Sequence, residues 1–399
     1  MSELERLIQE HCPNGVEYKP FGEMVSIVRG ASPRPIKNFI TTDSDGVNWI
    51  KIGDVKPGEK YINSTEEKII LEGVSRSRVV HKGDFILSNS MSFGRPYILN
   101  IDGCIHDGWL TIQNYSETFD KNYLYYILSS ADVFRQYITM AAGSSVQNLN
   151  KDKVSKLLVV APKDTKEQEK IAEALSDTDT LILSLEKLIE KKKAIKQGTT
   201  QNLLTGKIRL PGFSKQLEND YFKSFNVKIQ KGQTITKSQL REGYFPVVAG
   251  GRKPAYYCDI YNREGKTITI SASGASAGFV NIYSGKIFAS DCSTISESKE
   301  YDITYIYYLL LNQQGKIYSS QTGGAQPHIH PKDINNLKVF YTCDIKEQKA
   351  IAETLSDMDK EIEQLEQKLA KVHHIKQGMM QQLLTGKIRL VDKIITKEK

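Results

Sequence analysis

A stretch of 45 residues occurs twice in this chain, and this repeat constrains the fold more than any other feature. Residues 166–210 read KEQEKIAEALSDTDTLILSLEKLIEKKKAIKQGTTQNLLTGKIRL, and residues 346–390 read KEQKAIAETLSDMDKEIEQLEQKLAKVHHIKQGMMQQLLTGKIRL. The copies align without a gap, and about 27 of the 45 positions are identical, well above chance for a repeat of fixed period. The chain is therefore predicted to consist of two related halves, each ending in one copy.

Both copies of the repeat are predicted to form long helices. Their apolar residues recur at alternating steps of four and three, which is the heptad pattern of a coiled coil. The apolar positions are Ile171, Leu175, Ile182, Leu185, Ile189 and Leu203 in the first copy, and Ile351, Leu355, Met358, Ile362, Leu365, Leu369, Val372, Met379 and Leu383 in the second. Capping boxes of Thr165 with Gln168 and of Asp344 with Glu347 predict the helix starts, and Gly206 and Gly386 predict the ends.

A helix with an apolar seam needs a partner, and we expect the two copies to pair antiparallel within the chain. Packing of each helix on its own globular segment, or a coiled coil between chains, is the alternative. At ~1.5 Å per residue, a helix of about 38 residues is about 57 Å long. Gly198 and Gly378 lie inside the predicted helices, where either a close approach of the helices or a local break would explain them.

The globular segments that precede the two helices also correspond, although more weakly. Val28, Arg29 and Gly30 match Gln230, Lys231 and Gly232. Short apolar runs with strand character, such as 84–88, 156–160 and 267–271, alternate with Gly and Asn, and 123–128 and 303–311 are predicted to be short helices. The expected fold is α+β, with two α/β domains joined by two long antiparallel coiled-coil helices in a pseudo-twofold internal repeat. The predicted first half consists of a globular domain (1–163) and the first helix (164–210). The predicted second half consists of a globular domain (211–343), the second helix (344–390) and a tail (391–399).

Composition and charge narrow the function classes. The net charge is +7, and the excess lies mainly in residues 211–343, which permits nucleic-acid binding without establishing it. No apolar run reaches the roughly 18–20 residues that span a bilayer, and residues 1–10 do not resemble a signal peptide. The five scattered cysteines fit free thiols in a reducing cytoplasm better than a disulfide framework. We expect a cytoplasmic protein with no membrane association.

The repeated KEQ-x-x-IAE-x-L-SD-x-D and IKQG-x-x-Q-x-LLTGKIRL motifs resemble the conserved regions of type I restriction–modification specificity subunits. Residues 30–35 with 46–54, and residues 243–251 with 271–278, resemble target-recognition domains of that family. The resemblance covers nearly the whole chain except 391–399, and the helical repeat is its most specific part. It implies a non-catalytic subunit that reads a bipartite, asymmetric site in double-stranded DNA, one half-site per domain, with the paired helices setting the gap.

The same resemblance implies the partners. Two modification subunits are expected to dock along the helices, to bind S-adenosylmethionine and to methylate adenine, and restriction subunits, which are ATP-dependent nucleases and translocases, are expected to join them. This chain itself is expected to bind no cofactor and no metal.

Loops rich in Gly, Ser and Asn with interspersed Arg and Lys are the candidate DNA-contacting segments. Backbone amides and hydroxyls in such loops can approach phosphates, while long side chains reach base edges. The loops are 29–37, 88–95, 250–253, 271–278, and the pair 144–153 and 321–332; ordinary tight turns with solvated charges are the alternative. The candidate residues are Arg29, Ser32, Arg34, Lys37, Ser88, Asn89, Ser90, Arg95, Ser144, Gln147, Lys151, Lys231, Lys237, Arg252, Lys253, Ser271, Ser273, Ser276, Gln326, His328 and Lys332.

Catalytic and metal sites find little support in the sequence. His328 and His330 with Cys292 offer fewer than the four closely spaced ligands of structural zinc. Asp54 with residues 66–68 (Glu-Glu-Lys) has the loose pattern of a nuclease site, which also arises by chance in charged loops. No Gly-rich phosphate loop occurs, nor the Asn/Asp-Pro-Pro-Phe/Tyr run expected of an amino-methyltransferase. A self-contained methyltransferase or nuclease with an unrecognised site is the alternative reading, and a coiled-coil scaffold without a DNA role is a third.

Overall fold

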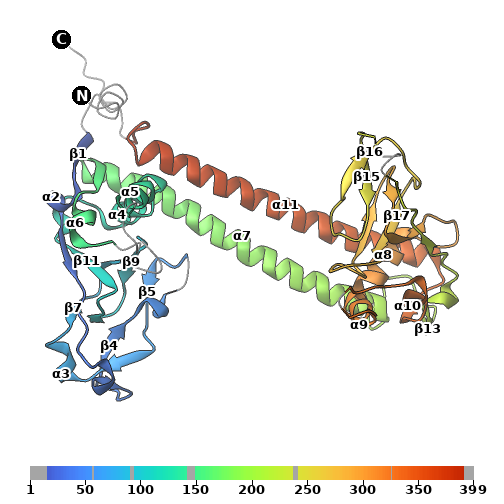
Figure 1. Ribbon diagram of the computed structural model, residues 1–399, viewed down its shortest axis with the longest axis horizontal. Coiled ribbons are helices and arrows are strands. Elements are labelled where there is room, and N and C mark those ends of the chain that lie inside the picture. Colours follow the sequence, from blue (N-terminus) through green and yellow to red (C-terminus); the bar gives the residue numbers. More distant parts are fainter. Residues whose placement is uncertain are drawn as a thin grey trace, which may run out of the picture. The chain divides into compact units, whose positions relative to one another are not determined.

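The computed structural model describes residues 16–55, 58–89, 94–141, 149–236, 241–324 and 326–390. The chain divides into two compact units, Met1–Ser184 with Leu369–Lys399, and Leu185–Lys368. Both long helices cross this division, so each unit contains one α/β module and one end of each helix (Figure 1). Among the residues in these ranges, no helix is long and apolar enough to cross a bilayer.

The first module precedes the first long helix and is built on two five-stranded sheets and a two-stranded ribbon. The sheets have the orders β3-β6-β4-β10-β7 and β2-β11-β8-β9-β5, and the ribbon pairs β1 with β12. The strands are β1 (Val16–Pro20), β2 (Ser26–Arg29), β3 (Ile40–Thr41), β4 (Val47–Ile50), β5 (Tyr61–Ile62), β6 (Glu67–Ile69), β7 (Arg78–Val80), β8 (Phe85–Ser88), β9 (Pro96–Leu99), β10 (Gly103–Ile105), β11 (Trp109–Gln113) and β12 (Leu158–Pro162). The helices are α2 (Phe21–Met24), η1 (Ile36–Asn38), η2 (Ile52–Asp54), α3 (Leu71–Val74), η3 (Tyr115–Glu117), α4 (Lys121–Leu128), α5 (Ala131–Ala141) and α6 (Lys151–Ser155).

The second module lies between the two long helices and has a four-stranded sheet, a three-stranded sheet and a ribbon. Their orders are β14-β20-β17-β18, β16-β15-β19 and β13-β21. The strands are β13 (Glu218–Tyr221), β14 (Gln230–Lys231), β15 (Phe245–Val248), β16 (Tyr256–Cys258), β17 (Thr267–Ser271), β18 (Val280–Tyr283), β19 (Phe288–Ala289), β20 (Cys292–Ser296) and β21 (Lys338–Tyr341). The helices are η4 (Phe222–Phe225), α8 (Ile303–Asn312), α9 (Gln314–Ser319) and α10 (Pro331–Asn335).

The two modules share one topology. The order β2-β11-β8-β9 in the first matches β14-β20-β17-β18 in the second, and β6-β4-β10 matches β16-β15-β19. The pairing directions agree as well, because β4 and β10 run parallel, as do β15 and β19. Each module also has a helix whose N-cap aspartate accepts from the backbone three residues on, Asp120 from Tyr123 and Asp302 from Tyr305. The internal repeat predicted from the sequence therefore extends through the modules.

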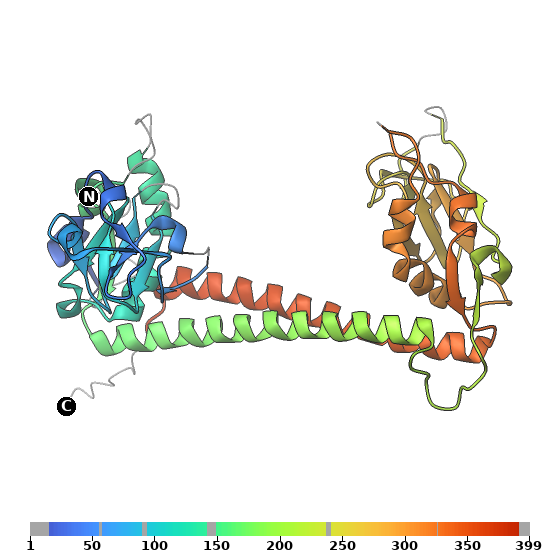
Figure 2. The same cartoon turned by 90° about the horizontal axis from the view of Figure 1, so that it is seen from below.

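The repeats form two uninterrupted helices, α7 (Thr165–Thr205) and α11 (Ile345–Leu383). Within each unit the ends of α7 and α11 run side by side and antiparallel, as Figure 2 shows. In the first unit Leu383 and Leu384 join the core cluster that contains Ile171 and Leu175. In the second unit Leu203 and Leu204 pack with Ile351 and Leu355. The predicted antiparallel pairing within the chain is confirmed.

The helix starts differ in detail from the prediction. Residue Asp164, not Thr165, caps α7, because its carboxylate accepts from the Lys166 amide at 2.9 Å. Asp344 caps α11 in the same way, accepting from Lys346 at 3.0 Å. The predicted cap Asp344 is confirmed and the predicted cap Thr165 is wrong. Neither capping box closes, because the side chains of Gln168 and Glu347 bond elsewhere. The predicted C-terminal glycines are confirmed by their positive φ, +71° at Gly206 and +72° at Gly386.

The glutamine of each KEQ motif fastens its helix to its module. Gln168 donates to the carbonyls of Thr118 and Pro162 and accepts from the Asp120 amide at 2.8 Å. Its counterpart Gln348 accepts from the Asp302 amide, also at 2.8 Å, and donates to the Thr342 carbonyl. Both glutamines are completely buried, so these bonds satisfy polar groups that water does not reach.

The second aspartate of each SD-x-D motif forms an ion pair with the lysine of the other copy's IKQG motif. Lys376 pairs with Asp179 at 2.5 Å, and Lys196 pairs with Asp359. The same carboxylates accept hydroxyl hydrogen bonds from helices α4 and α8, Asp179 from Tyr126 at 2.8 Å and Asp359 from Tyr308 at 2.7 Å. Burial raises the pKa of both tyrosines. Each motif thus joins α7, α11 and the module's own helix at one point.

Neither explanation offered for the two glycines inside the helices is correct. The helices run without a break through Gly198 and Gly378. A Cβ built on either glycine meets no atom within 4 Å, so no close approach requires its absence. Both glycines are therefore open to the outside of the helix pair.

Candidate DNA interface

The glycine directly after β2 in the first module, and after β14 in the second, brings two loops into contact. The Gly30 amide donates to the Trp109 carbonyl at 2.8 Å, and the Gly232 amide donates to the Cys292 carbonyl at 2.7 Å. A Cβ on Gly30 would lie 2.0 Å from the His106 carbonyl oxygen, and one on Gly232 would lie 2.0 Å from that of Ser290. Since no side chain tolerates such a distance, glycine is required at both positions.

An aspartate occupies the matching turn in both modules. Asp107 lies between β10 and β11, and Asp291 lies between β19 and β20. Each backbone carbonyl accepts from the residue that follows the central strand of the sheet: Asn89 Nδ2 donates to Asp107 at 2.9 Å, and the Ala272 amide donates to Asp291 at 3.1 Å. Each carboxylate accepts from a serine hydroxyl, that of Ser32 at 2.9 Å for Asp107 and that of Ser273 for Asp291.

In the first module the structure brings several predicted residues together around Asp107. The guanidinium of Arg34, whose side chain is 82% exposed, lies 3.4 Å from the carboxylate. Arg29 Nε donates to the Asp107 carbonyl at 3.2 Å. Arg34 and Arg29 are therefore at the surface, beside Ser32 and above the nearly buried Asn89.

In the second module the predicted residues meet around Asp291. A Cβ on Gly250 would lie 3.1 Å from the Asp291 Oδ2 atom, and Ser273 forms a β-bridge with His328. The His328 ring stacks on that of His330, with centroids 6.3 Å apart and planes 4° from parallel. The exposed Arg252 lies over the Phe279 ring, 5.4 Å from its centroid.

The remaining predicted residues fall into three groups. Ser88, Asn89 and Ser271 are buried, at 0%, 4% and 3% exposure, so their side chains are not presented at the surface, and direct contact with DNA stays a prediction for them. Lys37, Arg95, Lys151, Lys231, Lys253, Gln326 and Lys332 are exposed, and Ser276 is half-buried. Ser90, Ser144, Gln147 and Lys237 lie outside the described residues.

Sequence reasoning missed both aspartates and two arginines that support the loops. Arg78 Nε donates to the Arg29 carbonyl at 3.3 Å, and an Arg263 Nη donates to the Lys231 carbonyl at 3.1 Å. Basic and hydroxyl side chains in Gly-rich loops indicate DNA contact, whereas an acidic residue in a short turn does not. Asp107 and Asp291 occupy matching positions, two residues after β10 and two residues after β19, and this match becomes visible only in the strand order of the structure.

The neighbourhood of Asp107 favours its charged form. Burial is the largest single effect and raises the pKa of this carboxyl. The Ser32 hydrogen bond, the backbone amide of Asp107, His106 and Arg29 each lower the pKa, and together they outweigh burial, so that the net shift is downward. Burial is also the largest effect on His106, and it lowers the imidazole pKa despite the opposing effect of Asp107. His106 lies between Trp49 and Trp109, with ring centroids 6.3 Å from each.

The carboxylates of the loosely nuclease-like pattern lie around Lys51 and not around Lys68. Asp54 accepts from the backbone amides of Lys51 and Glu66, at 2.6 and 3.1 Å, and so closes the η2 turn. Glu67 pairs with Lys51 at 2.9 Å, and Lys68 donates to the Ser44 carbonyl. Within the described ranges, no three His, Cys, Asp or Glu side chains gather as a metal site would need.

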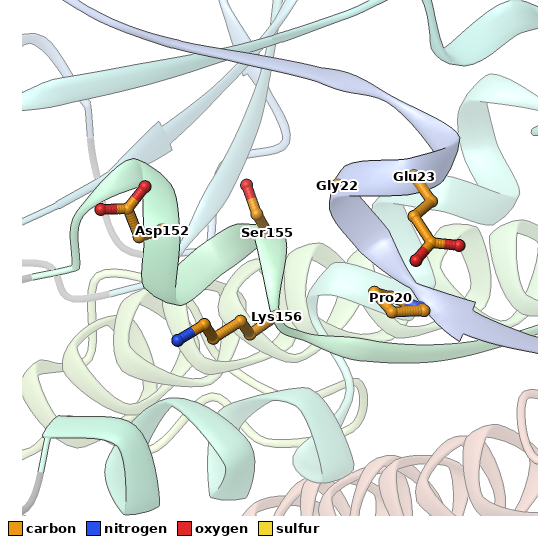
Figure 3. Close-up of a pocket in the computed structure, with 6 residues that line it drawn as sticks. All are labelled: Pro20, Gly22, Glu23, Asp152, Ser155 and Lys156. Carbon is orange, nitrogen blue, oxygen red and sulfur yellow. The ribbon is translucent and has the colours of Figure 1, made fainter.

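One open depression lies between the start of the first module and helix α6 (Figure 3). Its lining comes from Pro20, Gly22 and Glu23 on one side and from Asp152, Ser155 and Lys156 on the other. A Cβ on Gly22 would lie 2.6 Å from Ser155 Cβ, so the two segments touch at its base. Surface carboxylates and one lysine around a shallow hollow do not make a nucleophile–base arrangement.

Comparisons with known proteins agree with this geometry. A model of the type I restriction modification DNA specificity domain matches residues 13–197 and again 225–374. A type I restriction enzyme specificity subunit of Methanocaldococcus jannaschii, MjaVIII, is 23% identical, over 95% of this chain and 94% of its own. A putative type I specificity subunit of Mycoplasma genitalium is 30% identical over 34% of this chain and 37% of its own.

Solved structures share the fold. The crystal structure of a type I restriction–modification S subunit from M. genitalium superposes with a TM-score of 0.60 at 17% identity, covering 92% of this chain and 96% of that one. The HsdS subunit from Thermoanaerobacter tengcongensis gives 0.52 at 16% identity, covering 94% and 98%. The alternative of a self-contained methyltransferase or nuclease finds no support in these comparisons. The chain belongs to the type I restriction–modification DNA specificity family and is a DNA-recognition subunit, not a catalytic one.

Proposed function

We propose that this subunit reads a two-part, asymmetric DNA sequence, with one part read by each module. The observation that carries the proposal is the shared loop framework around Asp107 and Asp291, which presents different side chains in the two modules. Arg34, Ser32 and Asn89 surround the first aspartate, whereas Ser273 and Gly250 surround the second. Because the two loop frameworks share one architecture, each suits a stretch of the same DNA duplex. Because the side chains around the two aspartates differ, the two modules suit different base sequences.

The chemistry of the exposed side chains fits duplex DNA. Arginine and lysine attract phosphates, and an arginine that reaches the major groove can donate two hydrogen bonds to guanine. Arg34 and Arg252 combine high exposure with a position at the loop framework, so we assign them as the foremost candidates for base contact. Lys37, Arg95, Lys151, Lys253 and Lys332 are exposed nearby in sequence and suit phosphate contact.

We further propose that two modification subunits dock on the helices at equivalent positions. Ile195 and its counterpart Ile375 are 45% and 48% exposed, although the motif keeps isoleucine in both copies. Gly198 and Gly378 follow three residues later, hence on the same helix face, and no atom of the described residues lies within 4 Å of a Cβ built on either. An apolar side chain beside an open glycine suits a partner helix that approaches the backbone closely.

In this proposal the chemistry resides in the partners. The modification subunits bind S-adenosylmethionine and methylate adenine, restriction subunits cleave the DNA, and this chain binds no cofactor. The assembly works in the cytoplasm, where the free thiols of Cys104, Cys258, Cys292 and Cys343 are stable.

Mapping of methylated adenines tests the proposal. DNA from cells that carry this chain with its modification subunit should show one two-part sequence whose halves differ, and cells that lack this chain should show none. The purified chain alone should transfer no methyl group from labelled S-adenosylmethionine. A continuous or palindromic recognition sequence, or methyl transfer by the isolated chain, would contradict the proposal.

A further inference from the structure

We propose that Asp107 and Asp291 are positioning residues for sequence reading, each holding together the loops that recognise one half of the DNA site. The inference deepens the proposed function and rests on it. It assigns to two acidic residues, in an otherwise basic and hydroxyl-rich interface, the task of fixing where the neighbouring arginine and serine side chains point.

Asp107 connects three segments of the first module. Its carboxylate accepts from the Ser32 hydroxyl at 2.9 Å and pairs with Arg34, both in the loop after β2. Its amide donates back to Ser32 Oγ at 3.3 Å. Its carbonyl accepts from Arg29 at the end of β2 and from Asn89, which follows β8. One residue thus fixes the loop after β2, the segment after β8 and its own turn.

Asp291 also contacts neighbouring loops of its module, but it does so through different residues. Its carboxylate accepts from Ser273, which belongs to the loop after β17 and not to the one after β14. Its carbonyl accepts from the neighbouring Ala272 amide. The backbone of Gly250 passes so close that a Cβ there would lie 3.1 Å from the carboxylate and 2.6 Å from the Ser273 carbonyl oxygen. The loop that contains Arg252 therefore lies against Asp291.

Electrostatics favour positioning over phosphate contact. A carboxylate at a surface that meets the DNA backbone repels phosphate unless neighbouring donors neutralise it. Asp107 has such donors, since a hydroxyl and a guanidinium occupy its two oxygens. The pair also reduces the freedom of the highly exposed Arg34 side chain, and a side chain ordered in advance loses less entropy on binding.

The aspartates are not needed to hold the modules together. The side chain of Asp107 is 41% exposed, and Asp291 is exposed, whereas the cores are formed by strands such as β8 and β11 with the helices beneath them. Substitution of either aspartate should therefore change what is read more than whether the module folds.

Methylation mapping with the full chain and its modification subunit tests this inference. D107A should lower methylation of wild-type sites at least tenfold and admit new letters in one half-site only, while D291A should do so in the other half only. D107N keeps an acceptor for Ser32 but loses the charge, so its effect should be intermediate. Asp102 lies just before β10, whereas Asp107 lies just after it, and the side chain of Asp102 is 73% exposed. D102N is therefore the matched control for D107N and should leave both half-sites unchanged.

A second variant separates positioning from direct base contact. If Asp107 positions the loop, S32A should relax the same letters as D107A. Different letters for the two variants would show that Asp107 itself reads a base, and would overturn the inference. An unchanged recognition sequence in D107A, or equal damage to both half-sites, would also overturn it. If the wild type itself yields no two-part sequence, the proposed function fails before the inference is tested.

Discussion

The guanidinium of Arg209 donates two parallel hydrogen bonds of 2.7 Å to the carboxylate of Glu347, whose side chain is only 1% exposed. Its counterpart in the first unit joins Arg389 to Glu167 in the same bidentate manner. In both pairs the arginine of one copy's GKIRL motif meets the glutamate of the other copy's KEQ motif. This glutamate and this arginine, which are present in both copies, are therefore positions through which the two copies contact each other.

Loss of one glutamate should destabilise mainly its own unit. A buried arginine–carboxylate pair that loses one partner typically costs about 3 kcal/mol or more. Both tryptophans, Trp49 and Trp109, lie in the first unit, so their fluorescence reports on that unit during urea unfolding. The tryptophan transition should shift further in E167A than in E347A.

The matched surface control for this experiment is R135A. Its side chain is 75% exposed and pairs with Asp132 only three residues away, so removal should change the free energy of unfolding by less than about 1 kcal/mol. Equal shifts of the tryptophan transition in E167A and E347A would show that the two units do not unfold separately.

A truncated chain of residues 1–210 should form a dimer. It lacks Leu383, Leu384 and Arg389, which complete the first unit, but a second copy can supply the equivalent Leu203, Leu204 and Arg209. Light scattering should give twice the chain mass, and R209E should abolish the dimer. With the modification subunit, the dimer should methylate a palindrome built from the first half-site. Methylation of the original asymmetric site would refute the modular reading.

Lengthening both helices should widen the gap between half-sites without changing their letters. Seven residues inserted after Ser184 and after Lys368, where the chain passes between its units, keep the heptad phase and add about 10.5 Å of helix at ~1.5 Å per residue. At about 3.4 Å per base pair, the gap should grow by up to about three pairs. Affinity should fall, because the added DNA twist must be absorbed.

A four-residue insertion at the same places is the control. It introduces a stutter into the apolar seam and should reduce activity more than its shorter length implies. An active seven-residue variant with an unchanged gap would show that the helices do not set the spacing.

Alanine at Gly198 or Gly378 should raise stability. Glycine inside a helix costs about 1 kcal/mol relative to alanine, and an added Cβ meets no atom of the part of the chain that the structure describes. Thermal unfolding followed by circular dichroism measures the gain. If the glycines accept a partner helix, the same variants should bind the modification subunit more weakly, and I195E and I375E should each remove one of two bound copies. Undiminished binding in all four variants would place the docking surface elsewhere.

The sequence predicts the architecture well because the architecture depends on long periodic patterns. The heptad positions of 166–210 and 346–390, the C-terminal glycines and the runs that became β8, β17, α4 and α8 follow from local rules. The capping boxes failed because a buried long-range partner outweighs a local cap. Glu347 bonds to Arg209, 138 residues away, and Gln168 bonds to the first module.

The interface was less predictable, because loop composition does not fix which side chains meet. Ser88 and Ser271 fall in segments of the expected composition, yet they are the last residues of strands β8 and β17 and are buried. Asp107 and Asp291 could not be recognised from either sequence segment alone. Their shared role depends on the order of strands in the sheets, which brings the β10–β11 turn beside the residue after β8.

The reciprocal contacts of the repeat make its two copies interchangeable as connectors. The glutamate of KEQ, the second aspartate of SD-x-D, the lysine of IKQG and the arginine of GKIRL each pair with the other copy. The contacts of each copy with its own module are also equivalent, through Gln168 and Gln348 and through Tyr126 and Tyr308. We therefore expect that a different module would fit between the same helices if it kept the tyrosine and the N-cap aspartate that meet these motifs. Modules exchanged in this way would give as many two-part recognition sequences as there are pairs of modules.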